Sequence, residues 1–262
     1  MSDSAAFRSD GWGARARIGL ITPHNDVVPE SEFHALATEG ISVHAARVPL
    51  GWTSGPEPPL IGLDAVRAFA EPPHVDSAAE MLATMPLDAI AYGFTSSSYL
   101  LGPDGDARLK SRLEIMTGEI PVAIPCLAVV KALRALGVTT LALVNPPWFP
   151  ADLSEHGADY FRKSGIEVMY AASATGLAKD PLSVQPERLY EWVRKHTPRA
   201  TESIFLGGGG LRSIGVIEAL EEALALPVLT ANQVVFWQAL RLAGVEECLD
   251  GYGRIFEHPL PA

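Results

Sequence analysis

The stretch PVAIPCLAVVKALRALGV (121–138) recurs later in the chain as PVLTANQVVFWQALRLAGV (227–245). Both copies open with a Pro-Val strand, continue as a helix rich in Val and Leu, and share an Ala-Leu-Arg triplet and a Gly-Val exit. A strand ends upstream of each copy, IAYGF (90–94) before the first and IFLGG (204–208) before the second. Such an internal repeat indicates that one α/β unit occurs twice. The sequence therefore predicts two similar lobes related by a pseudo-twofold axis.

Short β-branched runs alternate with helical patterns along the whole chain, which is typical of parallel sheets with crossover helices. The expected strands span 17–23, 41–50, 89–94, 121–125, 140–145, 167–173, 203–207 and 227–230. The expected helices span 61–70, 76–85, 106–116, 127–136, 151–164, 186–196, 213–224 and 232–243. The predicted fold class is α/β, and each lobe is a parallel sheet flanked by helices. We expect residues 1–118 plus 226–262 to form the first lobe and 119–225 the second.

The functional site is expected between the lobes. In open α/β units, ligands bind outside the carboxyl ends of the strands. The two equivalent strand ends, at Phe94 and Gly208, should therefore face each other across one cleft.

Composition excludes several classes of partner. The 262 residues carry 31 Asp+Glu against 20 Lys+Arg, a net charge of −11, and no basic cluster, which argues against nucleic acid and anionic membranes as partners. The first 17 residues contain no apolar core of a signal peptide, and no apolar run is long enough to span a membrane. We therefore expect a cytoplasmic protein with no membrane partner.

Cofactor and metal chemistry are not indicated. Cys126 and Cys248 lie far apart without a CxxC motif or neighbouring histidines, which argues against disulfides and a zinc site. The chain has no phosphate-binding glycine fingerprint, so nucleotide binding is not expected. The expectation is a site with no cofactor and no metal.

Four segments, in order along nearly the whole chain, resemble the aspartate/glutamate racemase superfamily, in particular its maleate isomerase and arylmalonate decarboxylase branch. They are GLITPHNDVVPESEF (19–33), IAYGFTSSSYLLG (90–102), TGEIPVAIPCLAVVKALRALGV (117–138) and GGGGLRSIGVIEALEEALALPVLTANQVVFWQALRLAGV (207–245). The resemblance implies a cofactor-independent enzyme that acts next to the carboxylate of a small organic acid, by isomerisation, racemisation or decarboxylation.

Members of that superfamily use one or two cysteines at the two equivalent strand ends. In this chain the first place is held by Phe94, directly before Thr95 and Ser96, and the second by Gly208. Cys126 aligns with a helix start, and Cys248 lies beyond the last main helix. The resemblance therefore implies a variant of the family mechanism without these thiols. Phe94 in place of a thiol suggests an apolar ligand or a smaller pocket.

Two polar segments are candidate carboxylate-binding sites. The hydroxyls and N–H groups of Thr95, Ser96 and Ser97 can converge on an anion at a strand end, although hydroxyl residues there also cap helices. Thr95 and Ser96 match the carboxylate-holding positions of the resembled enzymes. The second segment is the glycine run 207–210, in which Gly208 and Gly209 could present backbone amides or could simply allow close packing.

His24 and Asp26 follow the first strand and are the candidate acid/base pair. Asp26 could orient His24 or act itself, and it stands where the resembled branch usually has an asparagine that contacts substrate. The alternative is an ordinary turn with side chains bonded to local backbone. Asn232, with Gln233, begins the last long helix, where capping is the first expectation and ligand contact the second. Trp148 falls in a loop where the resembled enzymes often place a carboxylate-holding tyrosine.

The rival interpretation is a non-catalytic carboxylate-binding or regulatory protein on the same fold. Both interpretations require a small carboxylic acid as partner. The sequence leaves open the identity of that acid and the oligomeric state, a homo-oligomer included.

Overall fold

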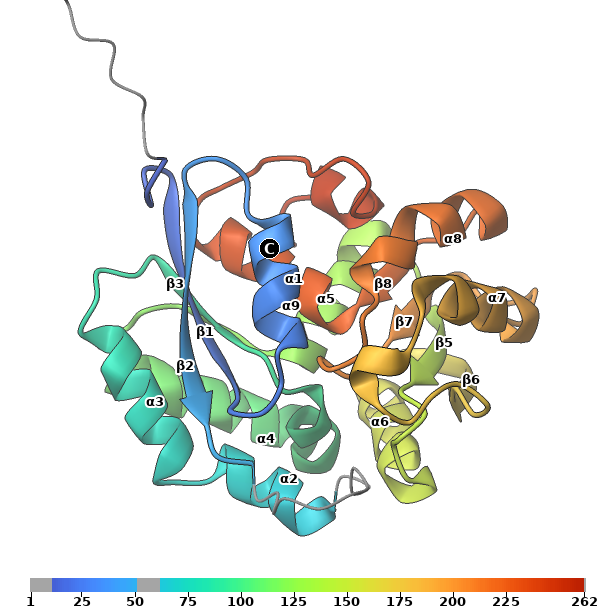
Figure 1. Cartoon of the computed structure of the whole chain (residues 1–262), viewed down its shortest axis with the longest axis horizontal. Helices are drawn as coiled ribbons and strands as arrows, with labels where there is room; N and C mark the ends of the chain where they lie inside the picture. Colours follow the sequence, from blue (N-terminus) through green and yellow to red (C-terminus); the bar gives the residue numbers. More distant parts are fainter. Residues whose placement is uncertain (1–10, 51–61, 262) are drawn as a thin grey trace, which may run out of the picture.

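A computed structural model describes residues 11–50 and 62–261, and these contain two four-stranded parallel sheets (Figure 1). The first sheet has the order β2-β1-β3-β4, with β1 (Ala16–Pro23), β2 (Ile41–Val48), β3 (Ala89–Tyr92) and β4 (Val122–Ala123). The second has the order β6-β5-β7-β8, with β5 (Thr140–Asn145), β6 (Glu167–Ser173), β7 (Ile204–Leu206) and β8 (Val228–Thr230). The two orders follow the same pattern, so the predicted α/β fold with two similar lobes is confirmed. Residues 1–10 and Ile61, part of the expected first lobe and of an expected helix, lie outside the described residues.

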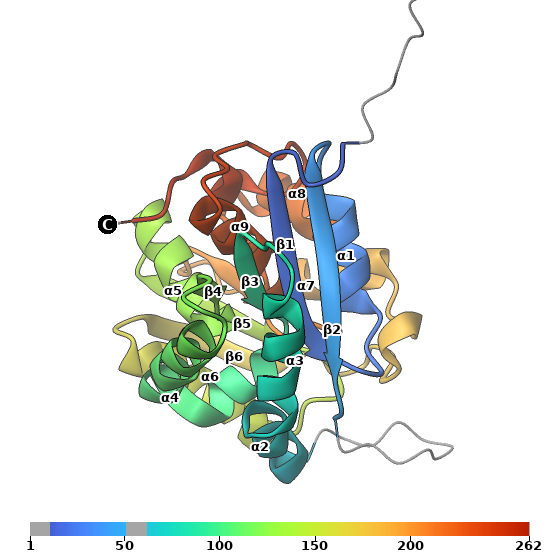
Figure 2. The ribbon, with the colours of Figure 1, turned by 90° about the vertical axis from the view of Figure 1, so that its left-hand side faces the viewer.

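The first sheet is buried on both faces, as expected of a parallel sheet. Ile18 and Leu20 of β1 join one hydrophobic cluster, and Ile21 joins another. Helices α1 (Val28–Leu36) and α9 (Ala231–Leu242) belong to the first cluster, while α2 (Leu63–Ala70) and α3 (His74–Ala83) belong to the second (Figure 2). Helix α4 (Thr95–Met116) contributes to both, with Tyr99 in the first cluster and Leu109 in the second.

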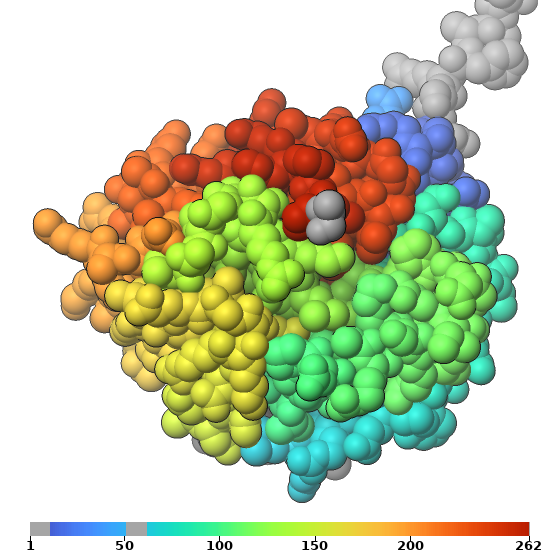
Figure 3. Space-filling model, turned by 180° about the vertical axis from the view of Figure 1, so that it is seen from behind, coloured from blue at the N-terminus to red at the C-terminus, as the bar shows by residue number. Residues whose placement is uncertain are grey.

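In the second lobe, α6 (Ala151–Lys163) packs on β5 and β6, α8 (Ile217–Leu224) packs on β8, and α7 (Pro186–His196) packs on α8. Helix α5 (Pro125–Leu136) contacts α4, α6 and α9, and α4 also contacts α6. Seen from behind, these helices adjoin over the junction of the lobes (Figure 3). Within the described ranges, no helix is long and apolar enough to cross a bilayer.

Three helical segments differ from the sequence-based expectation. Helix α1 was not expected, because an acidic residue, Glu32, interrupts its apolar face. Helix α4 begins at Thr95 rather than at residue 106, and it is kinked where Gly102 adopts φ 69° before Pro103. The expected helix 213–224 is a short 3₁₀ turn, Ile214–Val216, followed by α8.

Strand pairing divides the chain differently from the expected lobe boundaries at 118/119 and 225/226. β4 pairs with β3 in the first sheet, and β8 pairs with β7 in the second. The chain therefore passes from the first lobe to the second after β4, and from the second lobe back to the first after β8. Helix α9, which follows β8, packs on β3, β4 and α1 of the first lobe.

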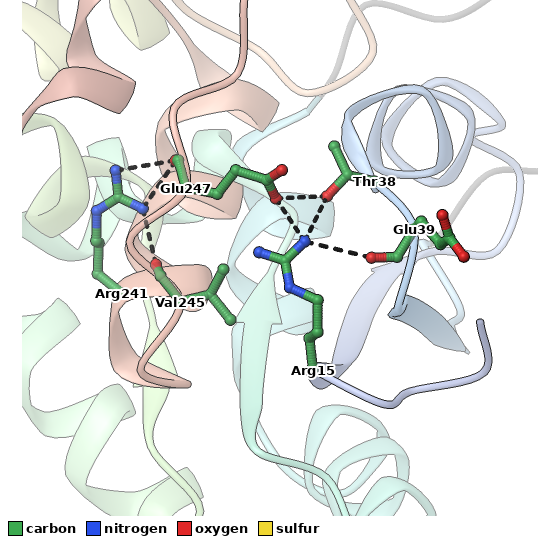
Figure 4. Close-up of polar contacts among 6 residues, drawn as sticks. All are labelled: Arg15, Thr38, Glu39, Arg241, Val245 and Glu247. Atoms are coloured by element: carbon green, nitrogen blue, oxygen red, sulfur yellow. Dashed lines mark hydrogen bonds and ion pairs between the residues drawn. The ribbon is translucent and has the colours of Figure 1, made fainter. Parts of the chain in front are cut away.

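The C-terminal segment is held by α9 and by the start of the first lobe (Figure 4). The Arg241 side chain, only 9% exposed, donates to the carbonyl oxygens of Val245, Glu247, Phe256 and His258. The Glu247 carboxylate accepts from Thr38 and pairs with Arg15 at 2.8 Å. One arginine thus organises the chain that follows α9.

We predict that Arg241→Gln lowers the free energy of unfolding by about 2–4 kcal/mol, because several buried carbonyls lose a charged donor. Urea denaturation measures the change, and limited proteolysis should then cut after residue 243. Arg162→Gln is the matched control, since Arg162 makes only exposed ion pairs with Glu155 and Asp159, and should cost under about 1 kcal/mol. Equal losses in both variants would contradict this role for Arg241.

Candidate active site

The two equivalent strand ends meet. The N–H of Gly93 donates to Ile21 O at 2.7 Å, and the N–H of Gly207 donates to Val144 O at 2.8 Å in the matching place of the second lobe. Phe94 and Gly208 are therefore equivalent positions. A β-carbon placed on Gly209 would lie 3.2 Å from the carbonyl oxygen of Gly93, so the ends lie in contact across the lobe junction.

The glycine run 207–210 is closely packed at every position. A β-carbon on Gly207 would collide with the Tyr99 hydroxyl, and one on Gly208 with the ring of Pro146. On Gly210 it would lie 2.8 Å from Oδ2 of Asp26. Gly208 also adopts φ 81°, a conformation that favours glycine. A side chain at 208, a thiol included, has no room in this arrangement.

Hydrogen-bond donors without protein partners lie on both sides of the junction. Among the described residues, the hydroxyls of Thr95 and Ser96 make no hydrogen bond, and the two side chains are each 2% exposed. The backbone N–H groups of Gly208, Gly209 and Gly210 likewise have no acceptor in the described chain. The first N–H groups of a helix also lack intrahelical partners, which adds those of Thr95 and Ser96. These donors are suited to an anion.

Ser97, Phe94 and Trp148 are placed differently from Thr95 and Ser96. The Ser97 hydroxyl donates to Phe94 O at 2.9 Å and bonds to the Tyr92 hydroxyl, so it serves the helix start inside the first lobe. The Phe94 ring packs on Phe69, with centroids 4.3 Å apart. Trp148 is 7% exposed and belongs to the main hydrophobic core. The two aromatic side chains are therefore held by hydrophobic packing, and Ser97 is committed to the helix start.

The loop after β1 is fixed by Arg47. This guanidinium donates to the carbonyl oxygens of Pro23, His24 and Asp26, and pairs with Glu30. His24 is exposed, and its Nδ1 accepts the N–H of Leu50 at 3.1 Å. The structure has no hydrogen bond between His24 and Asp26, so the expectation that Asp26 orients His24 is not met: the turn aims the two side chains at different partners.

Asp26 is turned toward the glycine run. Its Oδ1 accepts the N–H of Val28 at 3.0 Å, and its Oδ2 faces Gly210. Burial raises the pKa of Asp26 above 3.8, against the opposing effects of the Val28 N–H and of Arg47. A carboxyl with a raised pKa beside unpartnered donors can hold or deliver a proton.

Asn232 and Gln233 have different hydrogen-bond partners. Gln233 accepts the N–H of Thr230 at 3.0 Å, which confirms the capping interpretation for that residue. Asn232 Nδ2 donates to Gly209 O at 2.8 Å and to Oε2 of Glu32 at 2.7 Å. Asn232 thus supports the glycine run through its amide nitrogen.

Glu32 is the site residue that sequence reasoning missed. It is 6% exposed and lies at the lobe junction. The available signal was its spacing: in a helix over 28–36, Glu32 falls on the same face as Val28 and Leu36. A lone acid on an apolar helical face points to a buried partner.

The comparisons with known proteins agree with the observed fold. The family model of arylmalonate decarboxylase matches residues 69–256. The chain belongs to the arylmalonate decarboxylase family. Arylmalonate decarboxylase of Bordetella bronchiseptica is 29% identical over 167 residues, covering 62% of this chain and 68% of that protein. Maleate isomerase of Geobacillus stearothermophilus is 24% identical over 255 residues, covering 91% and 96%. A maleate isomerase variant from Pseudomonas putida S16, solved with maleate, has the same fold, with a TM-score of 0.81, 20% identity and coverage of 94% and 98%.

The cysteines of this arylmalonate decarboxylase family member lie away from the strand ends in sequence. Cys126 is fully buried at the start of α5, and burial raises the pKa of its thiol well above 9.0. Cys248 is exposed in the C-terminal segment. A thiol kept protonated by burial is a poor nucleophile.

We predict that Gly208→Ala lowers the free energy of unfolding by about 2 kcal/mol or more, because the new β-carbon meets Pro146 and the backbone has positive φ. Gly215→Ala is the control, since a β-carbon there would have no atom within 4 Å, and it should change stability by under about 0.5 kcal/mol. Thermal or urea unfolding measures both. A neutral Gly208→Ala would show that the run does not need glycine.

Proposed function

We propose that the protein is a cofactor-independent enzyme that acts on the carbon next to a carboxylate of a small organic acid, without a cysteine at either strand end. The observation that carries this proposal is the presence of unpartnered donors on both lobes together with one carboxyl, Asp26, whose Oδ2 faces Gly210 of the glycine run. The names of the family relatives support an isomerase or decarboxylase activity.

The donors suit a carboxylate that gains charge during reaction. The hydroxyl and N–H groups of Thr95 and Ser96 would hold the retained carboxylate. The N–H groups of Gly208–Gly210 would face it from the second lobe. Preorganised donors in a water-poor site stabilise an enediolate more than they would in water.

Decarboxylation is the reaction that needs the fewest groups. The bond from the α-carbon to the departing carboxylate breaks, CO₂ leaves, and the electron pair remains as an enediolate. The proton of the Asp26 carboxyl then forms the new C–H bond, and solvent reprotonates Asp26. Isomerisation by thiol addition requires a nucleophile where this chain has Phe94 and Gly208. We therefore favour a decarboxylase acting on a malonate-type acid.

The test is turnover of malonate, phenylmalonate and maleate in D₂O, followed by NMR. Decarboxylation should give a product with one deuterium on the α-carbon for each CO₂ released. Binding of these acids without turnover would establish the rival, a carboxylate-binding protein. Isomerised maleate without CO₂ release would overturn the decarboxylase assignment.

We predict that Asp26→Asn lowers kcat by about 10²–10⁴-fold with little change in ligand affinity, because an amide cannot deliver the proton. His24→Ala should retain turnover within a few-fold, since its exposed ring is not bonded to Asp26. Cys126→Ser is a further control that should also retain activity. Steady-state kinetics on the identified substrate decides. Loss of activity only in His24→Ala would transfer the acid role to His24, and loss in Cys126→Ser would refute the thiol-free mechanism.

We predict that Thr95→Ala or Ser96→Ala weakens carboxylate binding by about 1–3 kcal/mol, the usual cost of a lost hydrogen bond to a charged group. Ser97→Ala is the matched control, because its hydroxyl is bonded to Phe94 and Tyr92. It should affect unfolding more than affinity. Titration calorimetry with the same acid separates the cases, and unchanged affinity in both site variants would contradict the proposed anion site.

A further inference from the structure

Glu32 joins three chain segments at the junction of the lobes. It projects from α1 of the first lobe, and its Oε1 accepts the N–H groups of Ser213 at 2.8 Å and Ile214 at 3.1 Å in the second lobe. Its Oε2 accepts Nδ2 of Asn232 on α9 at 2.7 Å. Every one of these donors points at a single carboxylate that is almost fully buried.

The same carboxylate therefore holds the glycine segment at two places. Asn232 Nδ2, oriented by Glu32, also donates to Gly209 O at 2.8 Å. Ser213 and Ile214 are the residues where the segment turns into the next helix. Glycines have no side chains to anchor them; here Gly209 is itself one attachment, and Gly210 lies between it and the other at Ser213.

We propose that Glu32 is a positioning residue that, through Asn232 and the N–H groups of Ser213 and Ile214, fixes the amides of Gly208–Gly210 opposite Thr95 and Ser96. That those amides bind the substrate carboxylate rests on the proposed function. That Glu32 fixes the segment does not depend on the proposed function, and it can be tested without a substrate.

Protonation should loosen this arrangement. The ionised carboxylate accepts all three donors, whereas a protonated carboxyl carries a hydrogen of its own where one donor now points. Burial raises the pKa of Glu32 to about 7, opposed by its three hydrogen bonds and assisted by the charge of Asp26, the neighbouring carboxyl in the loop after β1. The segment should therefore become less ordered as pH falls through about 7.

Global stability should respond with the opposite sign. The folded-state pKa of Glu32 stands above its ordinary value of 4.5, so this group contributes stability below about pH 4.5 that is lost as pH rises through about 7. Lowering the pH from 8 to about 5.5 thus favours the folded state through Glu32 while loosening the glycine segment. A glutamate that only stabilised the fold would not make global stability and the order of the glycine segment change in opposite directions with pH.

The experiment is hydrogen exchange measured by mass spectrometry on the full chain, comparing peptides over 207–214 with peptides over β6 and α7. In Glu32→Gln, and equally in Asn232→Ala, exchange over 207–214 should rise by about tenfold or more, with little change elsewhere. The double variant should exceed neither single variant by more than about twofold, because both act through one contact.

Glu221→Gln is the matched control. Glu221 also accepts backbone N–H groups, those of Val228 and Arg254, but away from the glycine run. It should lower the melting temperature without loosening 207–214.

In the unmodified protein, exchange over 207–214, corrected for intrinsic rate, should rise as pH falls from 8 to about 5.5, and this rise should be absent in Glu32→Gln. That measurement needs no variant if Glu32→Gln fails to fold. Exchange that is unchanged in both variants, or independent of pH in the unmodified protein, would overturn the proposal. A loosened segment with undiminished affinity for malonate would support the positioning role and overturn the use of the glycine amides in binding.

Discussion

Backbone meets backbone where the two lobes join. A β-carbon on Gly209 would lie only 3.2 Å from the carbonyl oxygen of Gly93, and the rest of the site is arranged around that close approach. Because the strand ends approach so closely, the residues at the contact can offer only peptide groups. Reactive side chains must come from the flanking segments, which are the start of α4, the loop after β1 and the start of α9.

Two carboxyls lie at the junction where we propose that an anion binds. Asp26 and Glu32 are both carboxyls with raised pKa values, and the charge of Asp26 helps to raise the pKa of Glu32. An incoming carboxylate would raise both pKa values further, since like charges disfavour ionisation. Ligand binding and proton uptake should therefore be linked, and the proton taken up would be stored beside the reacting carbon.

The fold was predictable because the internal repeat and the alternation of strands and helices are local patterns. The equivalence of Phe94 and Gly208 was predictable for the same reason, since each follows the third strand of its sheet. The direction of individual side chains was not. Ser97 lies between Ser96 and Ser98 in one hydroxyl run, and only the helical turn of α4 commits it to Phe94 O. Glu32 was hidden because its partners, Ser213 and Asn232, are distant in sequence.

Helix α9 follows a strand of the second sheet yet packs on the first, and the chain crosses between the sheets after β4 as well. The lobes are consequently not two consecutive segments of the chain, because the first lobe continues after the second. A cut between them would remove from each lobe an element that covers its core. The molecule should unfold as one cooperative unit, and the relative orientation of the lobes should last as long as the fold itself, since neither half can reorient without breaking its own hydrophobic packing.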